Sequence, residues 1–259
     1  MAGIGAEDWF TIEQIDEATY AISEYKHYEH THAYLLFGTD AALLIDTGLG
    51  VGDMAGAVSS LTRLPVEAAA THAHWDHIGG HAQFPRFAVH AAEAAWLAGA
   101  FPLPLEAVRA QLLKEPCDFP AEFDAAAYRL FKGTPSRILH DLDTFELGGR
   151  LVRVLHTPGH SPGHMCFYEP DRGYLYTGDL IYLGCLDAYY PTTGPAAFAR
   201  SVARVAALPV SRILPGHHAL DVPTDLPKRV DAAFSTLAER GLLYHGAGVF
   251  EFGDFGVRL

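Results

Sequence analysis

The sequence has few cysteines and no long apolar run. Its three cysteines lie far apart and form no C-x-x-C pair, which excludes a disulfide framework and a zinc site built on thiolates. No stretch of about 18 apolar residues is present, so we expect no membrane-spanning helix. Acidic residues interrupt the N-terminal region and no basic segment precedes an apolar one, so we expect no signal peptide and a cytoplasmic location.

Basic residues are also scarce. Lys and Arg total 18 against 31 Asp and Glu, which gives a formal net charge of −13. This charge argues against nucleic acid or an anionic membrane as the main partner, because both attract basic surfaces. At 259 residues, 49% of them hydrophobic, the chain can bury a sizeable core. We expect a single domain over residues 1–259 that acts on a small molecule.

Histidine, by contrast, is abundant, with 15 residues. Three of them lie in His72-Ala73-His74-Trp75-Asp76-His77, which packs three imidazoles and one carboxylate into six residues. Zinc and similar borderline metals prefer these ligands, and few structural roles need so many of them side by side. The motif predicts a metal site, with a histidine-rich surface turn as the alternative.

Apolar runs and their spacing predict a chain of alternating strands and helices. The predicted strands cover 18–23, 32–37, 41–45, 66–70, 87–90, 151–155, 165–168, 174–176 and 212–214, and the predicted helices cover 53–61, 91–98, 196–208 and 225–240. Strands followed by a helix occur twice, which favours two β-layers between outer helices.

Residues 101–137 differ from the rest, because five prolines break an apolar segment into short pieces. We interpret this segment as a helical insertion within the domain. It would form a lid that suits an acyl chain, the surface of a homodimer or a plain packing layer. For a lid, Phe119 and Phe123 are expected to contact the substrate.

Metal-competent side chains also follow other predicted strands. A loop fixed by two prolines and two glycines carries His160 and His164, while Asp46, Asp179 and His217 each follow a further strand. Loops carried by a rigid sheet are where active sites lie. These residues are therefore candidate functional residues together with the His72–His77 motif.

The pattern H-x-H-x-D-H followed by a distant His, Asp and His resembles the metallo-β-lactamase-fold hydrolase superfamily, and the similarity covers roughly residues 18–220. The resemblance implies an α/β fold with four layers in an αββα sandwich and a site for two divalent metal ions. The first ion would be held by His72, His74 and His160, the second by Asp76, His77 and His217, and Asp179 would bridge both. Asp46 would orient ligands from behind them, and His164 would have a structural or orienting role.

The implied chemistry is hydrolysis. Two divalent ions, zinc first with iron or manganese as alternatives, would share a bridging water and lower its pKa toward neutrality. The bridging hydroxide would attack the substrate, so no protein nucleophile is required. Asp76 and Asp179 count as catalytic residues because they hold the ions. We expect a metal-dependent hydrolase of a small ester, lactone or thioester.

The metal-ligand pattern does not identify the substrate. The resemblance to glyoxalase-II-like thioester hydrolases rests on Thr71–His77 and on Gly178-Asp179 followed by Gly184-Cys185. Tyr182, three residues after Asp179, matches a tyrosine of lactonases with this fold and is a candidate catalytic residue, with a packed aromatic as the alternative. Alternative activities are a mononuclear iron persulfide dioxygenase and a phosphodiesterase of the same fold. A complete ligand set disfavours a non-enzymatic binding module.

One histidine-rich run, His27 to His32, is not absorbed by the resemblance. It could reach the rim of the metal site from a neighbouring strand. We interpret His27, His30 and His32 instead as exposed residues on a solvated strand face.

Overall fold

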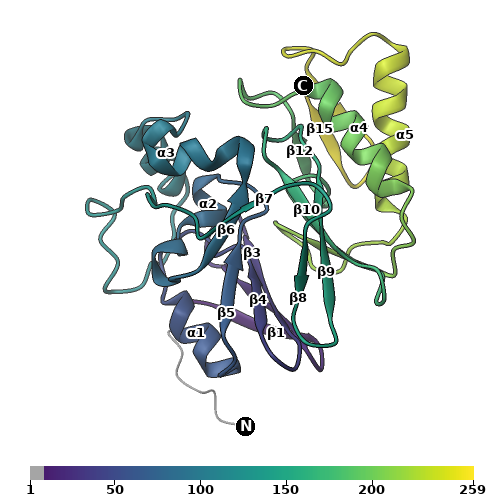
Figure 1. Ribbon diagram of the computed structural model, residues 1–259. Helices are drawn as coiled ribbons and strands as arrows, with labels where there is room; N and C mark the ends of the chain where they lie inside the picture. The colour runs from purple at the N-terminus through teal and green to yellow at the C-terminus, as the bar shows by residue number, and fades with distance from the viewer. Residues whose placement is uncertain (1–8) are drawn as a thin grey trace. The chain divides into compact units, whose positions relative to one another are not determined.

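The computed structural model describes residues 9–259, and their contacts divide them into two compact units (Figure 1). Unit 1 comprises residues 9–89, 93–138 and 146–150, and unit 2 comprises residues 90–92, 139–145 and 151–259. Within residues 9–259 no helix is both long and apolar enough to cross a lipid bilayer.

Unit 1 contains nearly all of a seven-stranded sheet whose strands follow chain order. They are β1 (Thr11–Asp16), β2 (Thr19–Ser23), β3 (His32–Phe37), β4 (Ala42–Ile45), β5 (Val66–Ala69), β6 (Phe87–His90) and β7 (Arg137–Leu139). The first four pair antiparallel, while β4, β5 and β6 pair parallel. Parallel neighbours end at the same edge of a sheet, so the residues after Ile45 and Ala69 begin there together.

Short helices connect the strands of unit 1. Helix α1 (Met54–Leu61) begins where the Asp53 carboxylate accepts a hydrogen bond of 2.8 Å from the Gly56 N–H, a typical N-cap. Its buried face joins the core formed by the sheet. The others are α2 (Trp75–Ile78), α3 (Leu105–Leu112), the 3₁₀ turn η1 (His81–Gln83) and the π-helical turn η3 (Trp96–Ala100). A second 3₁₀ turn, η2 (Ala91–Glu93), has its first two residues in unit 2 and its last in unit 1.

Unit 2 has a five-stranded sheet in the order β13-β11-β10-β9-β8 and a three-stranded sheet in the order β12-β15-β14. The strands are β8 (Thr144–Glu146), β9 (Leu151–His156), β10 (Met165–Glu169), β11 (Tyr174–Gly178), β12 (Cys185–Asp187), β13 (Arg212–Pro215), β14 (Val249–Glu251) and β15 (Gly256–Arg258). Helices α4 (Pro195–Ala206) and α5 (Leu226–Glu239), green and yellow in Figure 1, pack on each other through stacked Phe198 and Phe234, 5.0 Å between centroids.

The segment predicted as a helix over residues 91–98 is helical throughout, but it is not one regular α-helix. The 3₁₀ turn η2 continues through two α-helical residues, 94 and 95, into the π-helical turn η3, and side-chain hydrogen bonds flank this change of helix type. The His90 ring accepts a hydrogen bond from the Ala92 N–H at 3.2 Å, and the Glu93 carboxylate is turned inward onto the Ala73 N–H. Such local and long-range bonds compete with regular helix.

The segment 101–137 lies in unit 1 and is less helical than predicted. Helix α3 is the one α-helix in it, and turns and irregular chain form the remainder, as its prolines require. The carbonyl groups at the end of α3 are held by the histidine-rich run. His27 Nε2 donates to the Leu112 carbonyl at 3.0 Å, and the Tyr28 hydroxyl donates to the Gln111 carbonyl at 2.8 Å.

The interpretation of this run as a solvated face is wrong for His27 and His32, which are buried. Burial lowers the pKa of His27, so its ring is neutral when it holds α3. His32 Nδ1 lies 2.8 Å from the Ser23 hydroxyl on the neighbouring strand. Both histidines therefore have structural roles in unit 1.

Candidate functional site

Asp46 organises the metal-ligand motif of unit 1. It follows β4, and the motif follows the parallel neighbour β5. Its Oδ1 accepts from the Thr71 N–H at 2.7 Å, and its Oδ2 accepts from the Thr71 hydroxyl and from His77 Nδ1, both at 2.8 Å. Asp46 has a φ of +61°, a strained value for a non-glycine residue that the three hydrogen bonds help to maintain.

These bonds fix which ring nitrogens could bind a metal. His77 donates from Nδ1 to Asp46, so its Nε2 carries the lone pair. The Thr71 hydroxyl uses its proton on Asp46 and therefore accepts from His72 Nδ1 at 3.0 Å, which leaves the lone pair of His72 on Nε2. Both rings are thus prepared as ligands by the groups behind them.

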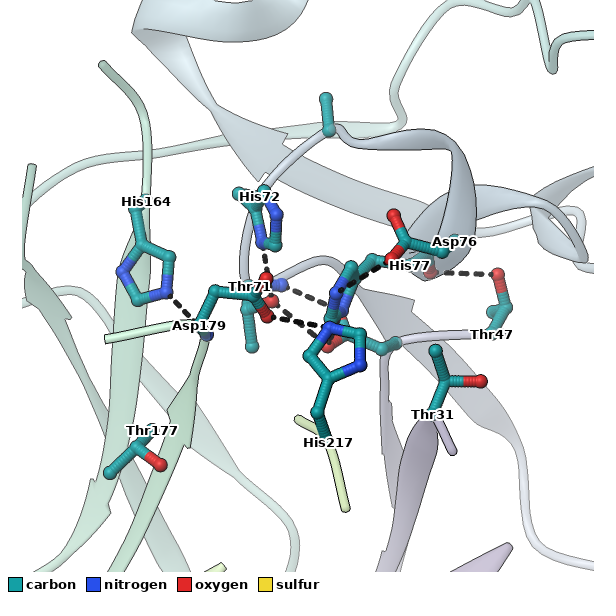
Figure 2. Close-up of polar contacts among 12 residues, drawn as sticks. Thr31, Thr47, Thr71, His72, Asp76, His77, His164, Thr177, Asp179 and His217 are labelled. Atoms are coloured by element: carbon teal, nitrogen blue, oxygen red, sulfur yellow. Dashed lines mark hydrogen bonds and ion pairs between the residues drawn. The ribbon is translucent and has the colours of Figure 1, made fainter. Parts of the chain in front are cut away.

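The predicted ligands of unit 1 lie close together. The ring centroid of His72 lies 4.2 Å from that of His77, and Asp76 Oδ2 lies 3.8 Å from His77 Nε2 (Figure 2). The ring centroid of His72 lies 4.4 Å from that of His74. A residue that the sequence analysis missed fixes the turn between them. The buried Glu93 carboxylate accepts from the Ala73 N–H at 2.6 Å. An acidic residue inside an alanine-rich run was the one signal for it.

In unit 2, Asp179 lies between two histidines. Asp179 and His217 follow β11 and β13, parallel neighbours in which Gly178 pairs with Pro215. Asp179 Oδ1 lies 3.2 Å from His217 Nε2, and Oδ2 lies 3.3 Å from His160 Nε2. Gly216 permits this approach, because a Cβ there would lie 3.0 Å from Asp179 Oδ1. Each oxygen therefore faces a different imidazole, as a bridging carboxylate would.

The donor set of unit 2 fits a cation. His160 donates from Nδ1 to the Asp187 carbonyl at 3.1 Å, so its Nε2 lone pair faces the Asp179 carboxylate. Two such acceptors need a proton or a metal ion between them. Ligands about 2.0–2.1 Å from a tetrahedral zinc ion lie about 3.3 Å from each other, close to both distances at Asp179.

His164 holds the backbone of Asp179. The Asp179 N–H donates to His164 Nε2 at 3.1 Å (Figure 2), and His164 Nδ1 donates to the Thr157 hydroxyl at 2.9 Å. Both ring nitrogens thus have other partners. This geometry supports His160 as the ligand of this loop and an orienting role for His164.

Tyr182 packs beside the predicted ligand His217. Its buried ring lies 5.7 Å from the ring of His217, and its hydroxyl donates to the Cys185 carbonyl at 2.6 Å. The hydroxyl proton is therefore committed to the backbone in this structure. The catalytic role of Tyr182 stays a prediction.

The described residues contain candidate metal sites made of histidine and aspartate. Each predicted ligand belongs to a group that could hold an ion: His72, His74, Asp76, His77, His160, Asp179 and His217. Six of the seven residues are buried, and His74 is partly exposed. Buried imidazoles and carboxylates suit zinc, iron or manganese.

The family model of the metallo-beta-lactamase superfamily matches residues 29–217, which is most of the chain. The chain therefore belongs to this superfamily. The fold class is confirmed as mixed α/β with two main sheets. A metallo-beta-lactamase from Pontibacter korlensis is similar over 87% of this chain and 99% of its own, with a TM-score of 0.65 and 19% identity, a likeness that concerns the fold alone.

Several relatives with similar sequences are thioesterases by name. The acyl-coenzyme A thioesterase MBLAC2 of Homo sapiens is 31% identical over 234 residues, which are 83% of this chain and 83% of the relative. An atrochrysone carboxyl ACP thioesterase of Aspergillus fumigatus is 28% identical over 155 residues, which are 58% of this chain and 29% of the relative. The prediction that this chain is a metal-dependent hydrolase is confirmed.

Proposed function

We propose that this hydrolase cleaves acyl thioesters at a centre of two divalent metal ions, with zinc as the expected metal and iron or manganese as alternatives. The similarity to the acyl-coenzyme A thioesterase MBLAC2 over 83% of both chains carries the thioester assignment. The proposed ligands of the two ions are His72, His74 and His160 for one and Asp76, His77 and His217 for the other, with Asp179 bridging. The orientation of the donors within each unit supports this assignment.

When bound, the ions would supply Lewis acidity and lower the pKa of water toward neutrality. The chain's own residues hold the donors ready. Asp46 and Thr71 keep the protons of His77 and His72 on Nδ1, and Glu93 fixes the backbone between His72 and His74. In unit 2, the Asp187 carbonyl fixes the His160 ring. Preset donors avoid the cost of reorganising side chains during the reaction.

Other reactions of this fold are less well supported. A lactonase role for Tyr182 would need its hydroxyl to leave the Cys185 carbonyl. A mononuclear iron persulfide dioxygenase and a phosphodiesterase could use similar ligands. A cytoplasmic location, a homodimer and a small-molecule substrate in place of nucleic acid or membrane stay predictions from composition and pattern.

The test compares substrates on one protein sample. The protein is stripped with a chelator and reloaded with zinc, iron or manganese, and is then given an acyl-coenzyme A, a homoserine lactone, a phosphodiester and a persulfide. Products are separated by chromatography, because a thiol-reactive dye would also react with the exposed Cys185. We expect thioester cleavage to need reloading and to exceed the other hydrolyses. Faster lactone or phosphodiester cleavage, or oxygen consumption with the persulfide, would contradict the proposal.

A further inference from the structure

Unit 1 has a pocket of about 590 Å³ in the region of η3 and the start of α3. This volume is within the range of about 300–1,000 Å³ that is usual for small-molecule sites. Its apolar walls are formed by Trp96, Phe101, Leu103, Leu105, Leu130 and Phe131. Leu103 is 42% exposed although it is a large apolar side chain, so a ligand could still cover it.

The pocket begins beside a candidate metal ligand. The indole ring of Trp96 lies parallel to the imidazole of His74, with 6.0 Å between centroids and 4° between planes. On the pocket side, Trp96 meets Phe101 edge to face at 5.9 Å. A continuous aromatic wall therefore runs from His74 into the pocket, all within unit 1.

The lining selects against a polar ligand. None of the lining side chains is a carboxylate, an amide or a hydroxyl, and the charged ones are Arg129 and Lys132. The Arg129 guanidinium already donates to the carbonyls of Ala126 and Tyr128 at 3.0 and 2.8 Å. A sugar or a nucleobase would find few hydrogen-bond partners here, whereas a hydrocarbon chain needs none.

We propose that this pocket holds the acyl chain of the thioester, an assignment that rests on the proposed function. A chain whose carbonyl is near His74 would extend along Trp96 and Phe101 and cover Leu103. Each methylene group that leaves water for such a wall strengthens binding about fourfold. The protein therefore selects for long acyl chains through residues 96–132.

This assignment replaces the expectation that Phe119 and Phe123 contact the substrate. Phe119 stacks on Trp9 at 5.8 Å, and Phe123 meets Tyr128 at 6.2 Å, in a cluster of unit 1 that also packs against Phe101, Leu105 and Leu130 of the pocket wall. Neither lines the pocket. The two phenylalanines hold the insertion together, while other residues of it meet the ligand.

Binding and turnover are measured together. Calorimetry compares the thioethers S-dodecyl and S-ethyl coenzyme A, which cannot be hydrolysed, and kinetics compares the matching acyl-coenzyme A esters. Leu103→Asp places a charge on the pocket wall. Leu113→Asp is the matched control, because Leu113 is another exposed leucine of the insertion, 49% accessible, and does not line the pocket. Leu103→Ser repeats the test with a milder change if Leu103→Asp does not fold.

We expect the dodecyl compound to bind at least tenfold more tightly than the ethyl compound. Leu103→Asp should reduce this binding preference at least tenfold, and it should reduce the kcat/KM preference for the long-chain ester by the same factor. Leu113→Asp should leave both preferences as in the wild type. An unchanged preference in both Leu103 variants would overturn the proposal. A second result would also overturn it: the Leu103 variants lose affinity and kcat/KM equally for both chain lengths, and this loss vanishes when N-acetylcysteamine replaces coenzyme A. The pocket would then bind the coenzyme A part of the substrate.

The two proposals fail in different ways. If no thioester is cleaved but the dodecyl preference is present and sensitive to Leu103, the proposed function is contradicted and the pocket is upheld as a site for acyl chains. If thioesters are cleaved without regard to chain length, the proposed function stands and the pocket assignment is overturned.

Discussion

Single residues behind the ligands decide whether the donors are ready for a metal. Asp46 receives three hydrogen bonds from Thr71 and His77 and is kept at a positive φ. One of these bonds fixes the proton of His77, and the others fix the residue next to His72. A carboxylate can accept all three, while an amide can accept at only one of its two polar atoms.

The variant Asp46→Asn is therefore expected to weaken metal binding about 10–100-fold, the usual effect of losing an orienting partner. Competition with a chromophoric chelator measures the affinity. Asp40→Asn, at an exposed aspartate before β4, should leave the affinity unchanged. Equal affinities of the wild type and Asp46→Asn would show that the carboxylate does not orient the ligands.

At the scale of single residues, the sequence predicted candidate metal ligands best where they are neighbours in the chain. The motif at 72–77 predicts its own candidate ligands, because a pattern of imidazoles and a carboxylate has few other uses, and each of them belongs to a group that could hold an ion. Glu93 was missed because its bond to Ala73 joins residues 20 positions apart. The same holds for Glu24, a buried carboxylate that binds Trp9, Thr31 and Leu49. No local sequence pattern predicts such long-range hydrogen bonds.

Among the elements, the loop between β9 and β10 depends most on close packing. Its Gly159 has a φ of +148°, and a Cβ there would lie 2.3 Å from Phe198 Cα on α4. The Gly194 N–H donates to the Gly159 carbonyl at 2.7 Å, and the Ser201 hydroxyl donates to the Pro158 carbonyl at 2.7 Å. The loop that carries His160 is thus seated on the start of α4.

Gly159→Ala should destabilise the protein by at least about 2 kcal/mol, because it adds both backbone strain and a collision with α4. In a thermal melt, this corresponds to a fall in Tm of roughly 4–8 °C. Gly241→Ala is the control, since Gly241 also has a positive φ but has open space around it. If both variants melt alike, the contact with Phe198 does not limit the loop.

Strands were predictable according to their length and burial, and the six-residue strand β1, which has no buried residue, was missed. Strands of four to six buried residues, such as β3, β4 and β10, carry apolar runs that the sequence shows directly. The three-residue strands β12, β14 and β15 were missed, because three residues are too few to show a period. Pairing with distant segments makes them strands, as between Cys185 and Gly256.

At the scale of the whole molecule, a histidine cluster of unit 2 makes stability depend on pH. The rings of His90 and His156 stack at 3.9 Å, and His140 lies 6.3 Å from His90. Burial and these imidazoles lower the pKa of His90 to about 4, although Asp141 and Asp143 oppose the shift. Unfolding would return it to about 6.5.

The unfolded chain therefore binds more protons at this site between pH 6.5 and 4, and stability is lost as the pH falls through that window. His90→Gln should reduce the loss by on the order of 2 kcal/mol, since each pKa unit corresponds to about 1.4 kcal/mol. Urea unfolding at pH 7.5 and pH 5 measures the difference. His245→Gln, at an exposed histidine outside this cluster, should keep the acid sensitivity of the wild type, and equal acid sensitivity in His90→Gln would refute the assignment.

The metal content of the purified protein tests the central claim most directly. Mass spectrometry of the elements is applied to the wild type, to Asp179→Ala and to the exposed control Asp171→Ala, none of them treated with chelator. The wild type and the control should hold close to two ions per chain. Asp179→Ala should lose the second ion and hydrolysis together. A wild type with almost no metal, or an Asp179→Ala protein with two ions and full activity, would contradict a dinuclear centre bridged by Asp179.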